Sequence, residues 1–393
     1  MDQNEGDALV DSIKAKLDSL SPLSTHCCIY KVPNKLRRLN PDSYKPRLIS
    51  FGPFHRGKDE LKAMEEHKYR TWEQDARSCY AEDVKLNSDE FVEMLVVDGS
   101  FLVELLLRSH YPQLRSEKDR IFEKPMMITD VCRDMILIEN QLPFFVIKGL
   151  FLLLVVYYQQ GTPSILKLAQ HHFSCFLSNI DEGKFISEPE HFVDLLRSCY
   201  LPRASTRMEE TTLKLDNAPE ATELHTAGVS FKPAESSSCL LDISFADGVL
   251  KIPTIFIDDF TESLCRNIIV FEQCHCLDKT FLHYTRLLSC FIKSPTDAEI
   301  LIRNGIIVNN LGNAEDVSKF INSICKEVIY GRGFYFSTLS ENLHAYCNTP
   351  WNRWKAILRR DYFHNPWSVA SVLAALLFLL LTFIQAVCSI LAL

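Results

Sequence analysis

The sequence lacks the short motifs that carry well-understood chemistry. It contains no Gly-x-Ser-x-Gly, Walker, Gly-x-Gly-x-x-Gly, His-Glu-x-x-His or protein-kinase signature. None of its Asn residues begins an Asn-x-Ser/Thr sequon, which argues against a glycosylated lumenal or exterior domain. The missing motifs leave no enzyme class as a starting point, although they do not exclude an enzyme of another type.

A basic surface for nucleic acid is also missing. The chain carries 42 Lys and Arg residues against 50 Asp and Glu residues, for a net charge of -8. Outside the stretch 353–360 there is no run of basic residues, and no basic stripe is interleaved with aromatics. The sequence therefore predicts no nucleic-acid partner.

The sequence offers no complete set of metal ligands. His171 or His172 could share a helix face with Cys175, but a structural zinc site needs four ligands and no matching pair is evident. A stripe of Cys and His on an expected helix over 261–289 has members about 10 Å apart, too far to share an ion. We assign no catalytic, cofactor-binding or metal residues and expect no cofactor. The stripe, read as part of the core, comprises Cys265, Cys276, His283 and Cys290.

Two polar clusters leave alternatives open. Asp130 and Asp134 share a helix face, and with Arg133 nearby they favour an exposed, salt-bridged surface over an acid–base pair. The cluster Glu139-Asn140-Gln141 joins two apolar helices just before a proline. It could form a binding site, but polar side chains at such a junction favour a turn between packed helices.

The 14 cysteines are spread singly, apart from Cys27-Cys28 and Cys274-x-Cys276. A chain of 393 residues can bury its own core without disulfides. We therefore expect reduced cysteines that act as small buried apolar residues, and no disulfide framework.

What the sequence does contain is a long uncharged C-terminal stretch. Residues 367–393 include no Asp, Glu, Lys or Arg, and a bilayer core needs roughly 20 apolar residues. The preceding segment, 346–366, is basic and aromatic, which suits the headgroup region and places the main domain on the cytosolic side. We expect a single-pass, tail-anchored membrane protein that binds the lipid bilayer through 367–393. The choice between plasma membrane and endomembrane stays open.

A second apolar run, Leu142 to Tyr158, raises the alternative of two spans. Lys148 interrupts it, and the uncharged part is near 12 residues, the length of a core helix. We therefore predict a buried helix here.

The periodicity predicts an α+β fold that is mostly helical, with one long helix over 89–108. Asp247-Gly248 between apolar runs predicts a β-hairpin, because glycine accepts a positive φ. We divide the chain into an N-terminal amphipathic helix over 1–24 and a globular domain over 25–345 with a surface loop near 203–217. The juxtamembrane segment 346–366 and the transmembrane helix 367–393 follow.

Ordered motifs run along nearly the whole chain. They include Val32-Pro33, Met64-Glu-Glu-His-Lys68, Asp98-Gly-Ser-Phe101, Leu137-Ile-Glu-Asn-Gln-Leu-Pro-Phe-Phe145, Ala221-Thr-Glu-Leu224, Leu241-Asp-Ile-Ser-Phe245, Arg266-Asn267 and Phe271-Glu-Gln-Cys-His275. These motifs resemble the plant family known as domain of unknown function 247, and the resemblance implies uncharacterised single-pass membrane proteins and no activity. At Gly52-Pro-Phe-His-Arg56 the chain departs from the commoner Gly-Pro-Tyr-His-His form, so no tyrosine nucleophile or paired-histidine site is carried over.

The function we expect is that of a tail-anchored recognition or signalling adaptor whose main domain binds another protein. One alternative is a membrane-tethered hydrolase or transferase of unrecognised type. Another is an exterior-facing ligand-recognition domain. A deep pocket with converging His and carboxylate groups would favour an enzyme, whereas a shallow patch would favour an adaptor.

Overall fold

The computed structural model describes residues 27–46, 53–54, 73–116, 119–155, 161–175, 188–201, 217–234, 239–330, 333–352, 354 and 366–391. The helix expected over 1–24 lies outside these residues, as does the loop expected near 203–217 apart from Asn217. The chain forms two compact units. Unit 1 comprises Met1–Leu177, Phe185–Ser198 and Ser263–Leu277, and unit 2 comprises Ser178–Lys184, Cys199–Glu262 and Asp278–Leu393.

Unit 1 is helical in its described part. Two of its helices, α8 and α10, continue by a few residues past the boundary between the units. The helices are α2 (Asn34–Arg37), α3 (Glu73–Ser78), α4 (Ser88–His110), α5 (Pro125–Met135), α6 (Phe144–Val155), α7 (Ile165–His172), α8 (Phe192–Tyr200) and α10 (Thr261–Cys274). Three short 3-10 turns accompany them, η1 (Pro41–Tyr44), η3 (Pro112–Leu114) and η4 (Phe173–Cys175).

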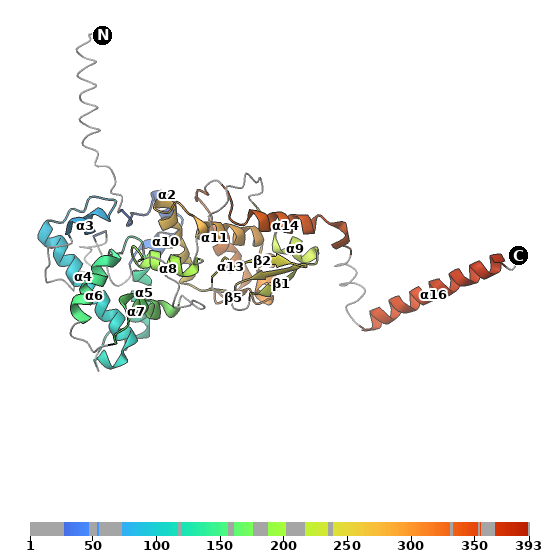
Figure 1. Cartoon of the computed structure of the whole chain (residues 1–393), viewed down its shortest axis with the longest axis horizontal. Helices are drawn as coiled ribbons and strands as arrows, with labels where there is room; N and C mark the ends of the chain where they lie inside the picture. Colours follow the sequence, from blue (N-terminus) through green and yellow to red (C-terminus); the bar gives the residue numbers. More distant parts are fainter. Residues whose placement is uncertain are drawn as a thin grey trace, which may run out of the picture. The chain divides into compact units, whose positions relative to one another are not determined.

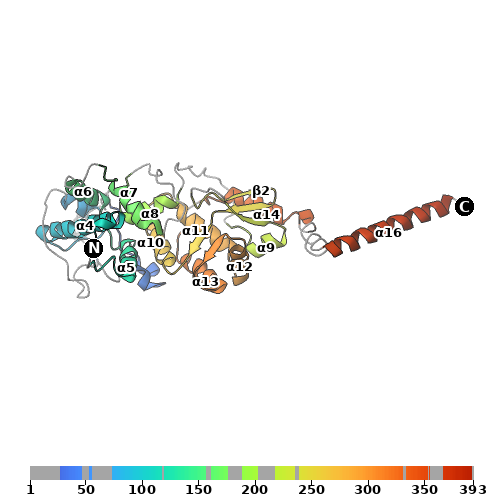
Figure 2. The same ribbon diagram turned by 90° about the horizontal axis from the view of Figure 1, so that it is seen from below.

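Helix α4 begins at a strong N-cap. The Asn87 side chain accepts a hydrogen bond from the Glu90 N–H at 2.9 Å, and the Glu90 carboxylate accepts one from the Asn87 N–H at 2.9 Å. This reciprocal capping box satisfies two N–H groups that a helix start leaves unpaired. Helices α6 and α7 pack against α4, as the two views of the ribbon show (Figure 1, Figure 2). The helix expected over 89–108 is confirmed.

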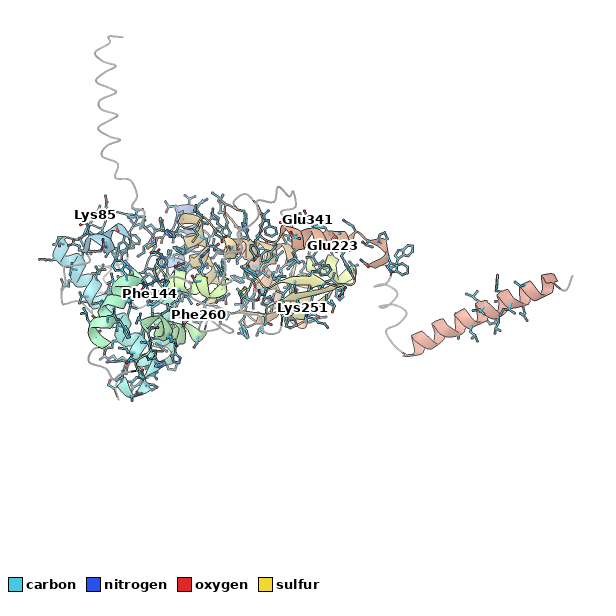
Figure 3. All side chains as sticks on the ribbon, viewed as in Figure 1. Lys85, Phe144, Glu223, Lys251, Phe260 and Glu341 are labelled. Carbon is cyan, nitrogen blue, oxygen red and sulfur yellow. The ribbon has the colours of Figure 1, made fainter. Side chains whose placement is uncertain are left out.

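The second apolar run forms a core helix rather than a span. In α6 the side chains of Phe144 and Val146 are 1% exposed, and Leu150 is 4% exposed. Phe144 is labelled among the side chains that fill unit 1 (Figure 3). A Cβ added to Gly99 of α4 would collide with the Leu150 side chain, so glycine permits the close approach of α4 and α6.

Unit 2 combines short strands with helices. Its strands are β1 (Ser230–Pro233), β2 (Ser244–Ala246), β3 (Val249–Ile252), β4 (Ile255–Ile257) and β5 (Ile307–Asn309). Its helices are α9 (Ala221–Thr226), α11 (Thr280–Phe291), α12 (Pro295–Arg303), α13 (Ala314–Ile324), α14 (Ser337–Cys347) and α16 (Pro366–Leu391).

The strands of unit 2 form two small sheets. In the first, strand order is β1-β3-β2, with β1 parallel and β2 antiparallel to β3. In the second, β4 pairs with β5 in parallel. Helix α14 packs against β2 and α9, and α12 packs against α13 (Figure 1, Figure 2). The expected hairpin is confirmed, with its turn at Asp247-Gly248. Strands β1 and β5 are not predicted from the sequence.

The expected membrane span is wrong for the part of the chain that the structure describes. No helix there is both long enough and apolar enough to cross a membrane. This finding corrects the transmembrane helix expected over 367–393 and the single-pass, tail-anchored localisation that rested on it.

One long expected helix is divided. The apolar pattern over 261–289 predicts a single helix, yet α10 ends at Cys274 and α11 begins at Thr280. The Thr280 hydroxyl donates a hydrogen bond to the Asp278 carboxylate at the start of α11. No Gly or Pro marks this break, which explains why the pattern does not reveal it.

Candidate functional site: the hairpin pocket

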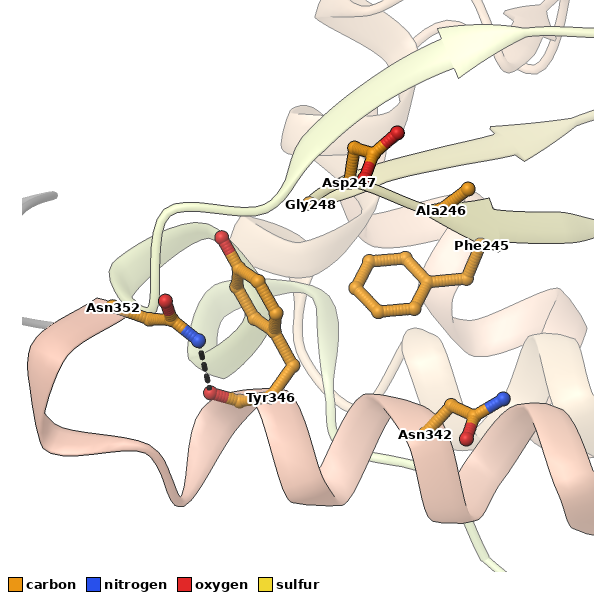
Figure 4. A pocket seen from close by; sticks show the side chains of 7 residues that line it. All are labelled: Phe245, Ala246, Asp247, Gly248, Asn342, Tyr346 and Asn352. Atoms are coloured by element: carbon orange, nitrogen blue, oxygen red, sulfur yellow. Dashed lines mark hydrogen bonds between the residues drawn. The ribbon is translucent and has the colours of Figure 1, made fainter.

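An open pocket of about 490 Å³ lies in unit 2, between the β2–β3 turn and α14 (Figure 4). We call it the hairpin pocket. It combines residues that are about a hundred positions apart in the sequence. The lining residues are Phe245, Ala246, Asp247, Gly248, Asn342, Tyr346 and Asn352.

The turn residues give the pocket its floor. Asp247 has φ 52° and Gly248 has φ 75°, as a two-residue hairpin turn with positive φ at both central positions requires. A Cβ added to Gly248 would lie 2.6 Å from the Tyr346 hydroxyl oxygen. Glycine is therefore required at position 248 for two reasons. It accepts the positive φ of the turn, and it leaves room for the Tyr346 side chain.

Two aromatic rings form one wall. The rings of Phe245 and Tyr346 meet edge to face, with centroids 5.3 Å apart and planes at 86°. Tyr346 points from α14 toward the turn, and Phe245 comes from β2 (Figure 4). Edge-to-face pairs stabilise a contact by about 0.5–1.5 kcal/mol beyond their buried area. The wall is thus fixed in place while both rings stay partly exposed.

The polar groups of the pocket suit hydrogen bonding more than proton transfer. The Asn352 side-chain N–H donates to the Tyr346 carbonyl oxygen at 3.1 Å, which leaves the Asn352 amide oxygen able to accept. Asn342 is exposed on α14 and offers both a donor and an acceptor. Asp247 is the one charged residue among those that line the pocket.

An edge strand and an exposed indole lie beside the pocket. Within the described residues, β2 is the last strand of its sheet, so one side of its backbone faces outward. Trp351 directly precedes Asn352 and is 70% exposed. Exposed aromatic rings beside unpaired strand groups are features of recognition surfaces.

The lining residues contain no histidine, cysteine or lysine that could act with Asp247 as an acid–base or nucleophilic pair. Across the described ranges, no group of three or more His, Cys, Asp and Glu residues could hold a metal ion. The arrangement can therefore bind an apolar side chain together with neutral hydrogen-bonding groups.

The cluster at Glu139-Asn140-Gln141 is structural. The Glu139 carboxylate accepts a hydrogen bond from the Val32 N–H at 2.6 Å. The side chain of Gln141 donates to the carbonyl oxygens of Met135 and Leu137, both at 2.8 Å. These bonds tie the α5–α6 junction to its neighbours inside the core. The alternative of a turn between packed helices is confirmed over that of a binding site.

His171 and His172, which the sequence places where either could share a helix face with Cys175, lie in different environments. His172 is 6% exposed, and its Nε2 lies 3.1 Å from the sulfur of Cys132, on α5. Burial lowers the pKa of His172 to about 4, with a further contribution from His171. The neighbouring His171 is exposed, and the side chain of Cys175 lies outside the described residues.

Burial also accounts for other histidines and cysteines. His283 is 1% exposed, and its Nδ1 accepts a hydrogen bond from the Tyr335 N–H at 3.0 Å. Cys276 falls between α10 and α11, so the expected stripe does not lie on one helix. Eight of the described cysteines are buried, which confirms for those eight the role of small core residues.

The expected acidic surface on α5 is wrong. Asp134 has no exposed surface, and Arg133 is only 5% exposed. The Arg133 guanidinium donates to the Asp42 carbonyl oxygen at 2.9 Å, and the Asn140 side chain donates to the Asp134 carbonyl oxygen at 2.9 Å. Asp134 and Arg133 are thus buried in unit 1, and the Arg133 guanidinium is paired with a backbone carbonyl there, whereas Asp130 is half-buried.

Comparison with known proteins places the chain in a family. The family described as "Plant protein of unknown function", DUF247, matches residues 29–74 and 69–381. The chain belongs to this family. The DUF247 chain is 27% identical to UPF0481 protein At3g47200 of Arabidopsis thaliana, with 93% of the chain and 87% of that protein covered. It is 23% identical to Putative UPF0481 protein At3g02645 of the same plant, covering 95% and 92%. No solved structure matches the chain.

The sequence locates only half of the hairpin pocket. The Asp-Gly turn is an explicit signal, and the Leu241–Phe245 motif leads into it. Nothing in the sequence places Tyr346 over that turn, because the contact depends on how α14 packs against β2. The sequence indicates this contact only through Gly248, whose lack of a side chain allows another residue to approach closely.

Proposed function

We propose that this DUF247 protein is a recognition module, and that the hairpin pocket binds a short extended segment of another protein. The observation that carries the proposal is the open pocket of about 490 Å³ with two aromatic rings and two amides beside an edge strand. Its role would be that of an adaptor that gathers a partner, without chemistry of its own.

The outward side of β2 supports an extended partner. A segment that pairs with Ser244–Ala246 would gain backbone hydrogen bonds along three residues, roughly 10 Å of strand. Alternate side chains of that segment would then face the pocket. Backbone pairing supplies affinity that is independent of sequence, whereas the pocket supplies selection.

The lining residues indicate which side chains the pocket would select. Phe245 and Tyr346 suit an aromatic or branched apolar side chain. Asn342 and Asn352 suit amide or hydroxyl groups, since each amide can pair with a donor or an acceptor. Asp247 favours a cationic side chain or an N–H donor at the rim.

The test uses peptides selected on the full chain from an unbiased displayed library. We expect Tyr346→Ala and Asn342→Ala to weaken binding of the selected peptides at least tenfold, about 1.4 kcal/mol each. Asn310→Ala is the matched control, since Asn310 is also exposed in unit 2 but does not line the pocket. Unchanged affinity in both pocket variants would contradict the proposal.

A further inference from the structure

Two cysteines from distant parts of unit 1 lie side by side. Ile29 and Tyr80 form a parallel β-bridge, and the Cys79 carbonyl oxygen accepts hydrogen bonds from the Cys28 N–H at 3.0 Å and the Ile29 N–H at 2.9 Å. Cys28 and Cys79 each directly precede one member of the bridge. Neighbouring positions on parallel strands project side chains to the same side.

The two thiols interact with each other. The Cys28 thiol hydrogen-bonds to Cys79, and this bond raises the pKa of Cys28 and lowers the pKa of Cys79 from its ordinary value of 9.0. Burial and the carboxylates of Glu190 and Asp75 oppose the lowering at Cys79. The hydrogen bond between the thiols outweighs them, so the pKa of Cys79 is the lowered one of the pair, although the Cys79 S–H also donates to the Asp75 carbonyl oxygen at 3.4 Å.

The difference in exposure between the two cysteines indicates which thiol reacts first. Cys28 has no exposed surface, whereas Cys79 is 5% exposed. A small oxidant therefore reaches Cys79 first and leaves Cys28 as the thiol that follows. Cys27 is no substitute for Cys28, because burial raises the pKa of Cys27 and its neighbour is Tyr30, whose hydroxyl donates to the Cys27 carbonyl oxygen at 2.8 Å.

We propose that Cys28 and Cys79 form a redox modification site that a peroxide converts into an intrachain disulfide. The Cys79 thiolate attacks one oxygen of hydrogen peroxide, which breaks the O–O bond and yields a sulfenic acid and, after protonation, water. The Cys28 sulfur then attacks the Cys79 sulfur and releases a second water. Two thiols are oxidised by two electrons and the peroxide is reduced to two waters.

The disulfide would join the segment around Ile29 to the segment between α3 and α4. It would close a loop between residues 28 and 79, and a crosslink over a stretch of that length restricts the unfolded chain. Oxidation should therefore raise the melting temperature of unit 1, by roughly 5 °C or more. Reduction should reverse the shift.

The experiment treats the full chain, freed of reductant, with about one equivalent of hydrogen peroxide and maps its peptides without reduction. The expected product is a crosslink between the peptides that contain Cys28 and Cys79, lower in mass by two hydrogens. Cys290→Ala, which removes a buried thiol of unit 2, should give the same product. Cys28→Ala should instead leave a sulfenic acid on Cys79 that a dione reagent traps.

Two results would overturn the proposal. In the unaltered chain, Cys28 and Cys79 could stay reduced while Cys274 and Cys276, which are more exposed, are oxidised. Alternatively, the crosslink could join either residue to another cysteine. Both results come from the unaltered protein, so they do not depend on whether a variant folds.

Discussion

At the scale of single residues, Asp297 shows how one buried carboxylate joins two helices of unit 2. Asp297 has no exposed surface. Its oxygens accept hydrogen bonds from the Thr222 N–H at 2.8 Å and from the Ser294 N–H at 2.9 Å and hydroxyl at 2.7 Å. The Lys293 N–H at 3.2 Å and the Thr222 hydroxyl add two more. One side chain thus caps α12 and holds the start of α9.

These contacts make a prediction for acid stability. Burial acts to raise the pKa of Asp297, but the hydrogen bonds from Thr222 and Ser294 outweigh it and keep the pKa below its ordinary value. An unfolded Asp has a pKa of about 4, so the stabilisation is fully present above that pH and is lost as pH falls through the folded pKa. Asp297→Asn should lower the free energy of unfolding by about 2–4 kcal/mol at pH 7.

Denaturant unfolding at pH 7 and pH 3 measures both effects. The difference between the native chain and Asp297→Asn should shrink in acid. Asp259→Asn, at an exposed position, is the control and should change the free energy of unfolding by less than about 0.5 kcal/mol. An equal loss for Asp297→Asn at both pH values would show that the charge of Asp297 is not what stabilises the α9–α12 contact.

At the scale of elements, the β2–β3 turn couples backbone geometry to the shape of the pocket. Gly248 has φ 75°, and an added Cβ would meet the Tyr346 hydroxyl. Gly312 has φ 110° but faces open space. The two glycines therefore separate the effect of backbone strain from the effect of the contact with α14.

We predict that Gly312→Ala costs about 1 kcal/mol of unfolding free energy, from the positive φ alone. Gly248→Ala should cost at least about 1 kcal/mol more, because Tyr346 must move as well. In a Tyr346→Phe background, part of the extra cost should disappear. Chemical denaturation of the four variants measures these differences, and equal costs for the two glycines would place Tyr346 away from the turn.

How far the sequence predicts the structure depends on where each signal lies. Helix α4 and the hairpin are predicted because their signals are local, namely the apolar period after Asn87 and the Asp-Gly pair. Strands β1 and β5 are missed because each is short and pairs with a distant segment. Asp134 is misassigned because burial of a charged residue depends on partners that only the folded chain brings together.

The hairpin pocket is likewise predicted only where its signal is local. Its turn is formed by two adjacent residues, but its aromatic wall also needs a residue of α14 that lies about a hundred positions later in the sequence. The membrane span was expected from hydropathy, from the basic and aromatic segment before it and from the family resemblance, yet no described helix meets its requirements of length and apolar character. Patterns within one segment thus predict secondary structure better than they predict where that segment lies.

At the scale of the whole molecule, the chain is an acidic protein of a plant family without an assigned activity. Among its described cysteines, Cys28 and Cys79 are the pair for which we propose oxidation in unit 1. The hairpin pocket, by contrast, belongs entirely to unit 2. Recognition and redox modification can therefore be tested separately, since a variant in one unit leaves the contacts of the other site unchanged.

The measurement that tests the recognition proposal most directly is photocrosslinking from inside the pocket in plant cells. A benzophenone side chain is placed at position 342 in one chain and at position 310 in another, both exposed sites of unit 2. We predict that irradiation joins position 342 to one or a few proteins through extended segments, and that position 310 does not capture them. The same weak background of adducts from both positions would contradict the account.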